Sequence, residues 1–313
     1  MTLQQLRDFL SVMEHGSFRA AARFSGVSQA GLTHSLKALE TSLGTALMIR
    51  NGRGVQLTPA GDRLRQRALL IDAEATRATN ELGGQEGVLR IGFSPTPSAL
   101  LLPKVVPLFR SRFPRSELRL MGGLFEKLLP AVRTGQLDFA VISLPDAGIN
   151  PGMRSQVLMK AEMAVVARRD HPLKAAWRLD ELAGQEWILM GPAGAPGGTV
   201  IRFFQECGLP RPHVAVVCDS FTQVTSLLAG SDYLALMPRL VLESNLLGQS
   251  IVEIKIREQA RGYDVALIQR SEVPLVPAAM ALAAMLTSCA RSVGQVAPPV
   301  ETSAKVAPRL QLT

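Results

Sequence analysis

Apolar residues recur every three or four positions in the first 44 residues, and glycines interrupt the pattern at Gly16, Gly26 and Gly44. Such spacing predicts short amphipathic helices that end where glycine lets the backbone turn sharply. Ser17 and Ser28 stand where the second and third helices begin, and serine is a preferred N-cap residue. The buried side of the second helix would carry Phe18, Ala21, Ala22 and Phe24. The sequence therefore predicts three short helices, the last two joined by a tight turn.

The third predicted helix has an apolar side and a polar side. Its apolar stripe steps by four, three and four residues through Leu32, Leu36, Leu39 and Leu43. Thr33, His34 and Lys37 lie off this stripe, so the outer face is polar. A DNA major groove, about 12 Å wide, admits one α-helix whose side chains reach base edges. We expect this helix to read DNA.

A short hairpin is predicted after the third helix. Residues 47–50 and 55–58 have strand patterns, and the turn between them contains Asn51, Gly52, Arg53 and Gly54. Arg50 and Arg53 taken alone fit a solvated turn as well as a binding site. Their place directly after a helix-turn-helix pattern favours contact with DNA phosphates. We therefore expect residues 1–58 to form a DNA-binding domain.

A long helix is predicted from Pro59 to Leu82, because proline is favoured at the first helical position. Its apolar residues follow coiled-coil spacing through Leu64, Ala68, Ile71, Ala75, Ala78 and Leu82. Such a stripe is exposed on a single chain, so we expect a second copy to cover it. Glycines at 83, 84 and 87 mark a hinge. Residues 59–87 are therefore predicted to be a linker and dimerisation helix.

From residue 88 onward, strand patterns and helix patterns alternate, which favours an α/β fold with largely parallel buried sheets. We expect strands at 88–93, 117–121, 137–143, 162–168, 187–190, 214–217, 233–237 and 265–269, and helices at 100–113, 124–134, 199–207, from 221, and 276–293. This series predicts two lobes, one from residues 88–160 with 266–293 and one from residues 161–265. Residues 294–313 lack a core pattern and contain three prolines, so a disordered tail is predicted.

Composition restricts the class of protein further. A chain of 313 residues with 47% hydrophobic residues can bury a core, and its net charge of +8 favours a polyanionic partner such as nucleic acid. The first twenty residues lack an uninterrupted apolar segment, which favours the cytoplasm over secretion, and no membrane association is expected. No catalytic motif or metal-ligand spacing is present, so we expect neither an enzyme nor a cofactor.

The run SFRAAARFSGVSQAGLTHSLKALETSLGTALMIRNGRGVQLTPAG at 17–61 resembles the winged helix-turn-helix of LysR-type transcriptional regulators. The segment VLRIGFSPTPSALLLP at 88–103 is similar to the start of their effector domain, and the resemblance extends to about residue 293. It implies a linker helix, a two-lobed domain like that of periplasmic binding proteins, and a homo-oligomer, dimer or tetramer. The partners it implies are an operator in double-stranded DNA and a small-molecule effector. The DNA-facing residues it implies are Ser28, Gln29, Thr33, His34, Lys37, Arg50 and Arg53.

The same resemblance implies an effector site between the lobes. The matching residues are Ser94, Thr96, Ser98, Gly123, Gly191 and Thr222. Hydroxyls in front of a helix N-terminus favour a carboxylate, a phosphate or a similar anion. However, Gly123 is followed by Leu124 and Phe125 where the family often supplies a hydroxyl. Either the ligand is more apolar or a backbone N–H takes the place of that donor.

Two alternatives remain open on the sequence alone. Cys207 and Cys218 are eleven residues apart, a spacing similar to that of the peroxide-sensing branch of the family, although two inert thiols explain it as well. Two α/β lobes also describe a solute-binding protein. That class needs a signal sequence and lacks a DNA-binding head, so the sequence favours the regulator.

Overall fold

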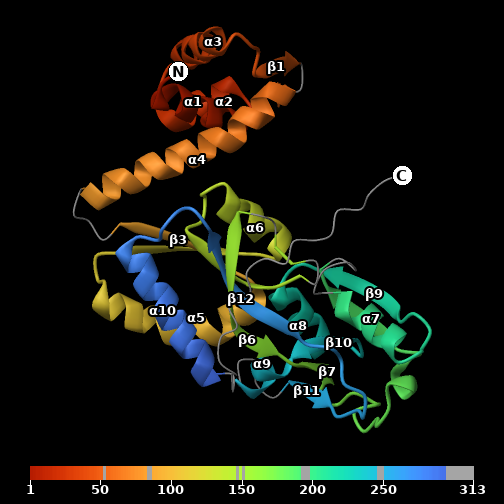
Figure 1. The fold of residues 1–313 in the computed structure, drawn as a ribbon. Coiled ribbons are helices and arrows are strands. Elements are labelled where there is room, and N and C mark those ends of the chain that lie inside the picture. Colours follow the sequence, from red (N-terminus) through yellow and green to blue (C-terminus); the bar gives the residue numbers. More distant parts are fainter. Residues whose placement is uncertain are drawn as a thin grey trace, which may run out of the picture. The chain divides into compact units, whose positions relative to one another are not determined.

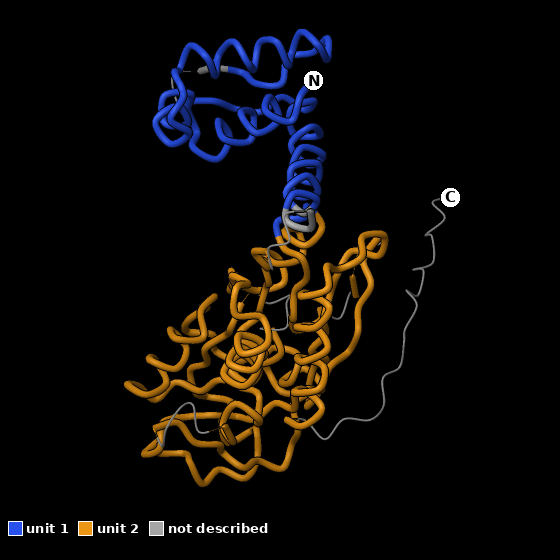
Figure 2. The backbone as a smooth tube through the Cα atoms, turned by 90° about the vertical axis from the view of Figure 1, so that its left-hand side faces the viewer, with its two compact units in different colours: residues 1–85, 134–136 blue, residues 86–133, 137–313 orange. Residues whose placement is uncertain are grey.

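The computed structural model describes residues 1–51, 54–82, 87–145, 148–149, 152–191, 198–244 and 250–293. The chain forms two compact units, residues 1–85 with 134–136 and residues 86–133 with 137–313 (Figure 2). The tail predicted at 294–313 lies outside the described residues. No helix in the described part of the chain is long and apolar enough to span a bilayer.

The first unit begins with the three predicted helices, α1 (Leu3–Glu14), α2 (Phe18–Ser25) and α3 (Gln29–Leu43), followed by the predicted hairpin of β1 (Met48–Asn51) and β2 (Gly54–Leu57) (Figure 1). The Ser17 hydroxyl accepts the amide proton of Ala20 at 3.1 Å and so caps α2. Gly26 (φ 69°) and Gly44 (φ 67°) end α2 and α3 in the left-handed conformation that glycine tolerates best. Local signals thus determine this helix-turn-helix.

The core of this unit contains the predicted apolar stripe of α3, with Leu32, Leu36 and Leu39 buried. The prediction for Phe24 was wrong, because its side chain is 75% exposed. Residues advance by about 100° around a helix, so Phe24 lies about 200° from buried Ala22. At the surface Phe24 contacts the ring of His15, with the ring centroids 4.4 Å apart.

The long helix α4 (Pro59–Leu82) has the predicted bounds. The first half of its apolar stripe is already covered within the chain. Ala68 is fully buried in the core of its own unit, and Leu64 packs against that core. Arg7 of α1 also pairs with Asp72 of α4, with Nε and Oδ1 2.6 Å apart. Ile71, in contrast, is 41% exposed. Only the later part of the predicted seam therefore lacks a partner within the described chain.

The second unit contains two five-stranded sheets, which define its lobes. The sheet of lobe I has the order β4-β3-β5-β12-β6, formed by β3 (Val88–Phe93), β4 (Glu117–Gly122), β5 (Phe139–Ser143), β6 (Met153–Ala161) and β12 (Tyr263–Arg270). Its helices are α5 (Pro95–Arg112), α6 (Phe125–Arg133) and α10 (Pro277–Val293). β3 is parallel to β4 and β5, whereas β12 is antiparallel to β5 and β6. The sheet is mixed, so the prediction of a largely parallel sheet was only half right.

Lobe II repeats this arrangement. Its sheet has the order β11-β7-β10-β8-β9, formed by β7 (Met163–Arg168), β8 (Glu186–Met190), β9 (His213–Cys218), β10 (Leu234–Pro238) and β11 (Ile251–Ile254). Its helices are α7 (Thr199–Glu206), α8 (Phe221–Gly230), α9 (Arg239–Glu243) and the 3₁₀ turn Leu179–Leu182. The chain enters lobe II after Ala161 and returns at Gly262. A Cβ at Gly262 would lie 2.4 Å from the Ala161 carbonyl oxygen, so the two crossings require glycine there.

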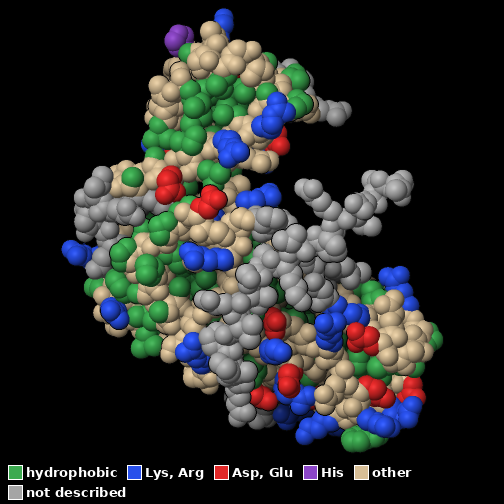
Figure 3. Space-filling model, viewed as in Figure 1, with side chains coloured by type: hydrophobic (Ala, Val, Ile, Leu, Met, Phe, Trp, Pro, Cys, Tyr) green, Lys and Arg blue, Asp and Glu red, His purple; other side chains and the backbone are tan. Residues whose placement is uncertain are grey.

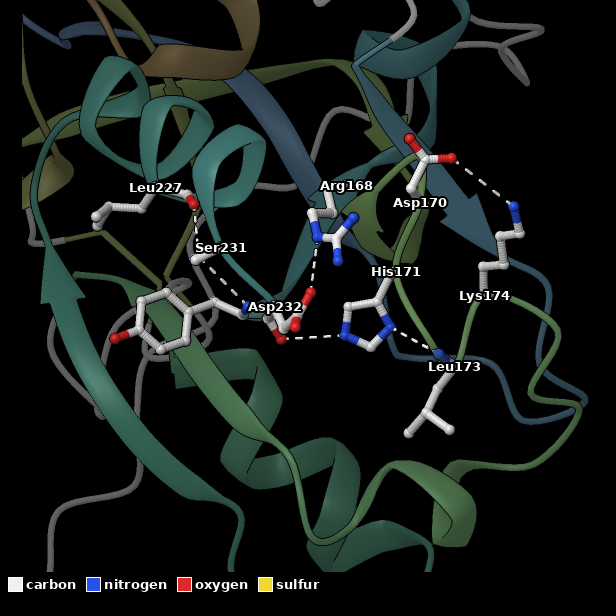
Figure 4. A network of polar contacts seen from close by, with 9 residues as sticks. Arg168, Asp170, His171, Leu173, Lys174, Leu227, Ser231 and Asp232 are labelled. Atoms are coloured by element: carbon white, nitrogen blue, oxygen red, sulfur yellow. Dashed lines mark hydrogen bonds and ion pairs between the residues drawn. The ribbon is translucent and has the colours of Figure 1, made fainter.

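A buried histidine fixes one end of lobe II (Figure 4). His171 is 2% exposed, and its Nδ1 accepts the amide proton of Leu173 at 3.0 Å. Its Nε2 therefore carries the proton and donates to the carbonyl oxygen of Asp232, also at 3.0 Å. The Asp232 carboxylate in turn pairs with Arg168 at 2.6 Å. The neutral ring thus ties the loop after β7 to the start of β10.

Candidate DNA-binding surface and effector cavity

The outer face of α3 carries the predicted DNA-reading residues. Gln29, His34 and Lys37 are exposed, and Thr33 is half-buried at the edge of the core. Because Leu32, Leu36 and Leu39 are buried, the rotation of α3 about its axis is fixed. The structure thus presents the four polar residues as one face.

Ser28 has a structural role in addition to its exposed position. Its Oγ accepts the amide proton of Gly31 at 3.0 Å, which is the N-cap bond of α3. A hydroxyl used in this way still offers its own O–H to another acceptor. Ser28 therefore sets the start of α3 and stands beside Gln29 on the exposed side.

The hairpin of β1 and β2, which we call the wing, is held to α3 by an acidic residue. The Glu40 carboxylate accepts the amide protons of Leu47 at 2.7 Å and Met48 at 3.3 Å. This fixes β1 against the end of α3. Arg50 lies in β1, but its side chain and the whole of Arg53 fall outside the described residues.

Two exposed arginines on α2 were not among the predicted contacts. Arg19 and Arg23 are one helical turn apart on the outer side of α2. In helix-turn-helix proteins the first helix crosses the phosphate backbone. Arg19 and Arg23 are therefore further candidates for phosphate contact. The surface of lobe II is not uniformly basic. Basic and acidic side chains are interspersed there around β7 and β11 (Figure 3).

A small cavity in the second unit is lined by residues from both lobes. Lobe I contributes Ser94, Pro95, Thr96, Leu124, Phe125, Ser143 and Tyr263. Lobe II contributes Met163, Ile188, Met190, Thr199, Val200, Leu236 and Pro238. The polar groups on the lobe I side are hydroxyls, whereas lobe II presents an almost wholly apolar wall.

The lobe I hydroxyls form a hydrogen-bonded chain. The Ser94 Oγ accepts the Ser143 amide proton at 3.0 Å and lies 3.3 Å from the Ser143 Oγ. Tyr263 hydrogen-bonds to Ser143 and, at 2.8 Å, to the Thr96 hydroxyl. Burial raises the pKa of the Tyr263 phenol, although the bonds with Thr96 and Ser143 lower it in part. The phenol is therefore neutral at physiological pH.

Two of the six predicted effector residues line this cavity. Ser94 and Thr96 do, at 3% and 4% exposure. Ser98, Gly123, Gly191 and Thr222 are not among the lining residues. Gly123 cannot offer its amide as the replacement donor, because that N–H donates to the Phe93 carbonyl at 3.3 Å.

Sequence reasoning missed Ser143, Thr199 and Tyr263. Ser143 ends a predicted strand and Thr199 begins a predicted helix, so the ends of these elements were the available signal. Tyr263 lies 167 residues from its partner Thr96 and had no local signal. In the described part of the chain, no group of three or more His, Cys, Asp and Glu residues is placed to hold a metal ion.

Comparison with known proteins assigns both units to one family. Residues 3–62 match the family described as "Bacterial regulatory helix-turn-helix protein, lysR family", and residues 82–290 match "LysR substrate binding domain". The chain belongs to the LysR family of transcriptional regulators. A relative named as a probable hydrogen peroxide-inducible genes activator, from Streptomyces viridosporus, is 30% identical over 86% of this chain and 88% of its own length. The regulator TdcA of Escherichia coli is 26% identical over 75% of this chain and 76% of its own.

Solved structures of LysR proteins share the fold. Full-length OxyR from Pseudomonas aeruginosa superposes with a TM-score of 0.68 at 23% identity, covering 97% of this chain and 99% of its own. CbnR complexed with its target DNA gives a TM-score of 0.64 at 20% identity, covering 94% of this chain and all of its own. This LysR protein is therefore a transcription regulator with a DNA-binding head and a two-lobed effector-binding domain, as the sequence predicted.

The three thiols of this LysR protein have raised pKa values. Burial and neighbouring acidic residues raise the pKa of Cys207 and of Cys218. Burial also raises the pKa of Cys289, against a smaller opposite effect of Lys104. Because the thiolate is the reactive form, a raised pKa slows oxidation. The structure gives no support to the redox alternative.

Proposed function

We propose that this LysR regulator reads its operator with the exposed face of α3 and holds phosphates with the wing. The observation that carries the proposal is the fixed rotation of α3, which buries its leucine stripe and exposes Gln29, Thr33, His34 and Lys37. In this assignment Gln29 and Thr33 contact base edges, while Lys37, Arg50 and Arg53 contact phosphates. Ser28 positions the helix start.

A pair of variants tests this division of roles. Gln29→Ala is expected to lose about 1 to 3 kcal/mol on the specific site and little on random DNA. Arg53→Ala is expected to weaken binding to the specific site and to random DNA equally. It should also reduce the number of counterions released on binding by about one. Fluorescence anisotropy with both DNAs at several salt concentrations measures these effects. Equal losses for Gln29→Ala on specific and random DNA would overturn the assignment.

We further propose that a small-molecule effector binds in the cavity between the lobes. A ligand there touches both lobes at once, so it favours one relative placement of them. The chain then acts by reversible binding rather than by catalysis, in the cytoplasm, where operator DNA is accessible. We assign DNA binding to residues 1–58, linkage to residues 59–87 and the response to ligand to the two lobes.

The exposed later part of the α4 seam supports a homo-oligomer. Ile71 and Ala78 are exposed and Ala75 is half-buried, at spacings of four and three residues. Covering this stripe with the same helix of a second copy would pair two heads. A dimer holds two half-sites at a fixed separation, which is how paired helix-turn-helix heads gain specificity. A tetramer follows if two such dimers associate.

A further inference from the structure

We propose that the effector is an uncharged molecule with an apolar body and a single polar end, rather than the anion that the sequence favoured. The inference rests on the proposed function, which places the effector in the cavity between the lobes. It concerns the chemistry of that ligand. Three features of the cavity carry it: the lack of charge among the described lining residues, the small number of hydroxyl donors on the lobe I side, and the division into a polar and an apolar wall.

Among the lining residues that the structure describes, none has a charged side chain. Arg239 adjoins the lining residue Pro238, but its guanidinium pairs with Glu253 at 2.8 Å. A carboxylate moved into this cavity would lose its hydration without gaining an opposite charge, which is strongly unfavourable.

The hydroxyl chain leaves few donors for a ligand. Its four hydroxyls, Ser94, Ser143, Tyr263 and Thr96, are linked by three hydrogen bonds, and each bond uses one O–H. One O–H therefore remains. A carboxylate has about four acceptor positions to satisfy, whereas a carbonyl or hydroxyl oxygen needs one or two donors. The Thr199 hydroxyl lies outside this chain, so the count applies to the lobe I wall, where it matches a neutral polar group.

The helix that the sequence suggested for anion binding is also poor in donors. Pro95 and Pro97 occupy the first and third positions of α5 and have no N–H, so Thr96 is the only amide donor among these three. α7 begins at the lining residue Thr199, and its amide end carries about half a positive charge. The first amides of α7 are therefore further donors to a ligand oxygen, although half a charge compensates a full anion only in part.

The opposite wall fits an apolar body. Met163, Ile188, Met190 and Leu236 line the cavity from lobe II, and Phe125 lines it from lobe I. Methionine side chains are flexible and polarisable and adapt to aromatic or irregular apolar groups. A ring or short aliphatic body against this wall would direct its polar end to the hydroxyl chain.

Probes of one shape and different charge test the inference. Benzamide and benzyl alcohol are neutral, benzoate is an anion and benzylammonium is a cation. Calorimetry on the full-length protein at pH 7.5 is expected to give at least about tenfold tighter binding for a neutral probe than for either ion. Because the phenol of Tyr263 remains neutral, the affinity for benzamide is expected to stay constant from pH 6 to pH 8.5.

Variants locate the binding. Tyr263→Phe is expected to weaken benzamide about 2- to 12-fold through the loss of one hydrogen bond. Leu124→Ser adds a hydroxyl to the cavity and is expected to raise the affinity for benzoate relative to the affinity for benzamide. Tyr233→Phe removes the same hydroxyl from a tyrosine outside the lining, so it is the matched control and should leave every affinity unchanged. Thermal denaturation of each variant shows whether it is folded.

The outcomes separate the ligand class from the site. Tighter binding of benzoate than of both neutral probes, weakened by Tyr263→Phe, would overturn the neutral class and leave the proposed effector site intact. Probe binding that neither Tyr263→Phe nor Leu124→Ser alters would place the ligand elsewhere and overturn both proposals. A failure of the neutral probes to bind at millimolar concentration would also contradict the inference.

Discussion

Replacing Ser28 by alanine removes the hydroxyl that accepts the Gly31 amide proton at 3.0 Å at the start of α3. Loss of a serine N-cap costs about 1 kcal/mol, which is a factor of about 5 in the opening equilibrium of the helix. The effect should be large here because Gly31 already lowers the helix propensity of the first turn by about 1 kcal/mol relative to alanine. Ser28→Asp keeps a capping oxygen and adds a charge that the helix N-terminus favours.

The two variants should differ in both hydrogen exchange and operator affinity. In hydrogen exchange of the full-length chain, read by mass spectrometry, amides of the first turns of α3 should exchange about 5-fold faster in Ser28→Ala and no faster in Ser28→Asp. Operator affinity, measured by anisotropy, should fall in Ser28→Asp because a carboxylate at the exposed start of α3 repels the negatively charged DNA. If Ser28→Ala loses operator affinity while its exchange matches the parent, Ser28 acts on DNA directly and the capping argument is refuted.

Other parts of the structure yield further predictions. Ile71→Asp should dissociate the oligomer and abolish operator binding, because a charge enters the proposed helix pair; light scattering measures the mass. His171→Ala should destabilise lobe II by about 2 to 5 kcal/mol, because the Leu173 amide and the Asp232 carbonyl both lose their partner; urea unfolding followed by tryptophan fluorescence measures it. Replacing Cys207 and Cys218 together by serine should leave operator binding unchanged with and without hydrogen peroxide, because both thiols have raised pKa values.

Matched controls sharpen these tests. Gln66→Asp adds the same charge at an exposed position of α4 off the seam and should leave the oligomer intact; an unchanged mass for Ile71→Asp as well would show that the seam packs elsewhere. Lys174→Ala removes only the exposed ion pair with Asp170, in which Nζ and Oδ1 are 4.0 Å apart. It should therefore change the free energy of unfolding by less than about 1 kcal/mol. Equal effects of Lys174→Ala and His171→Ala would contradict the role of the buried ring.

The head was predictable because its signals are local. Gly26 and Gly44 end helices through their own backbone conformation, and Pro59 begins α4 where its missing N–H costs nothing. The start of α5 was predicted five residues late, at residue 100. Pro95 and Pro97 were assigned to a turn, although the first turn of a helix accepts proline.

The lobes and the cavity depend on contacts between distant residues. β6 was missed because its burial alternates with charged side chains such as Arg154 and Lys160, as expected of an edge strand. The direction of β12 cannot be read locally, because a whole lobe separates it from β5 and β6 in the sequence. Tyr263 reaches the cavity only through that strand, so the hydroxyl chain was invisible until the fold placed its members together.

Footprinting tests the central claim most directly. Full-length protein first selects duplexes from a random pool, and the selected sequence is then footprinted with and without a ligand shown to bind the cavity. The account predicts two protected half-sites separated by a multiple of about 10 base pairs, a footprint that the cavity ligand changes, and for Gln29→Ala a sequence preference that is relaxed at the bases that Gln29 contacts. Enrichment by Gln29→Ala of the same sequence as the parent, or a footprint that the bound ligand leaves unaltered, would contradict it.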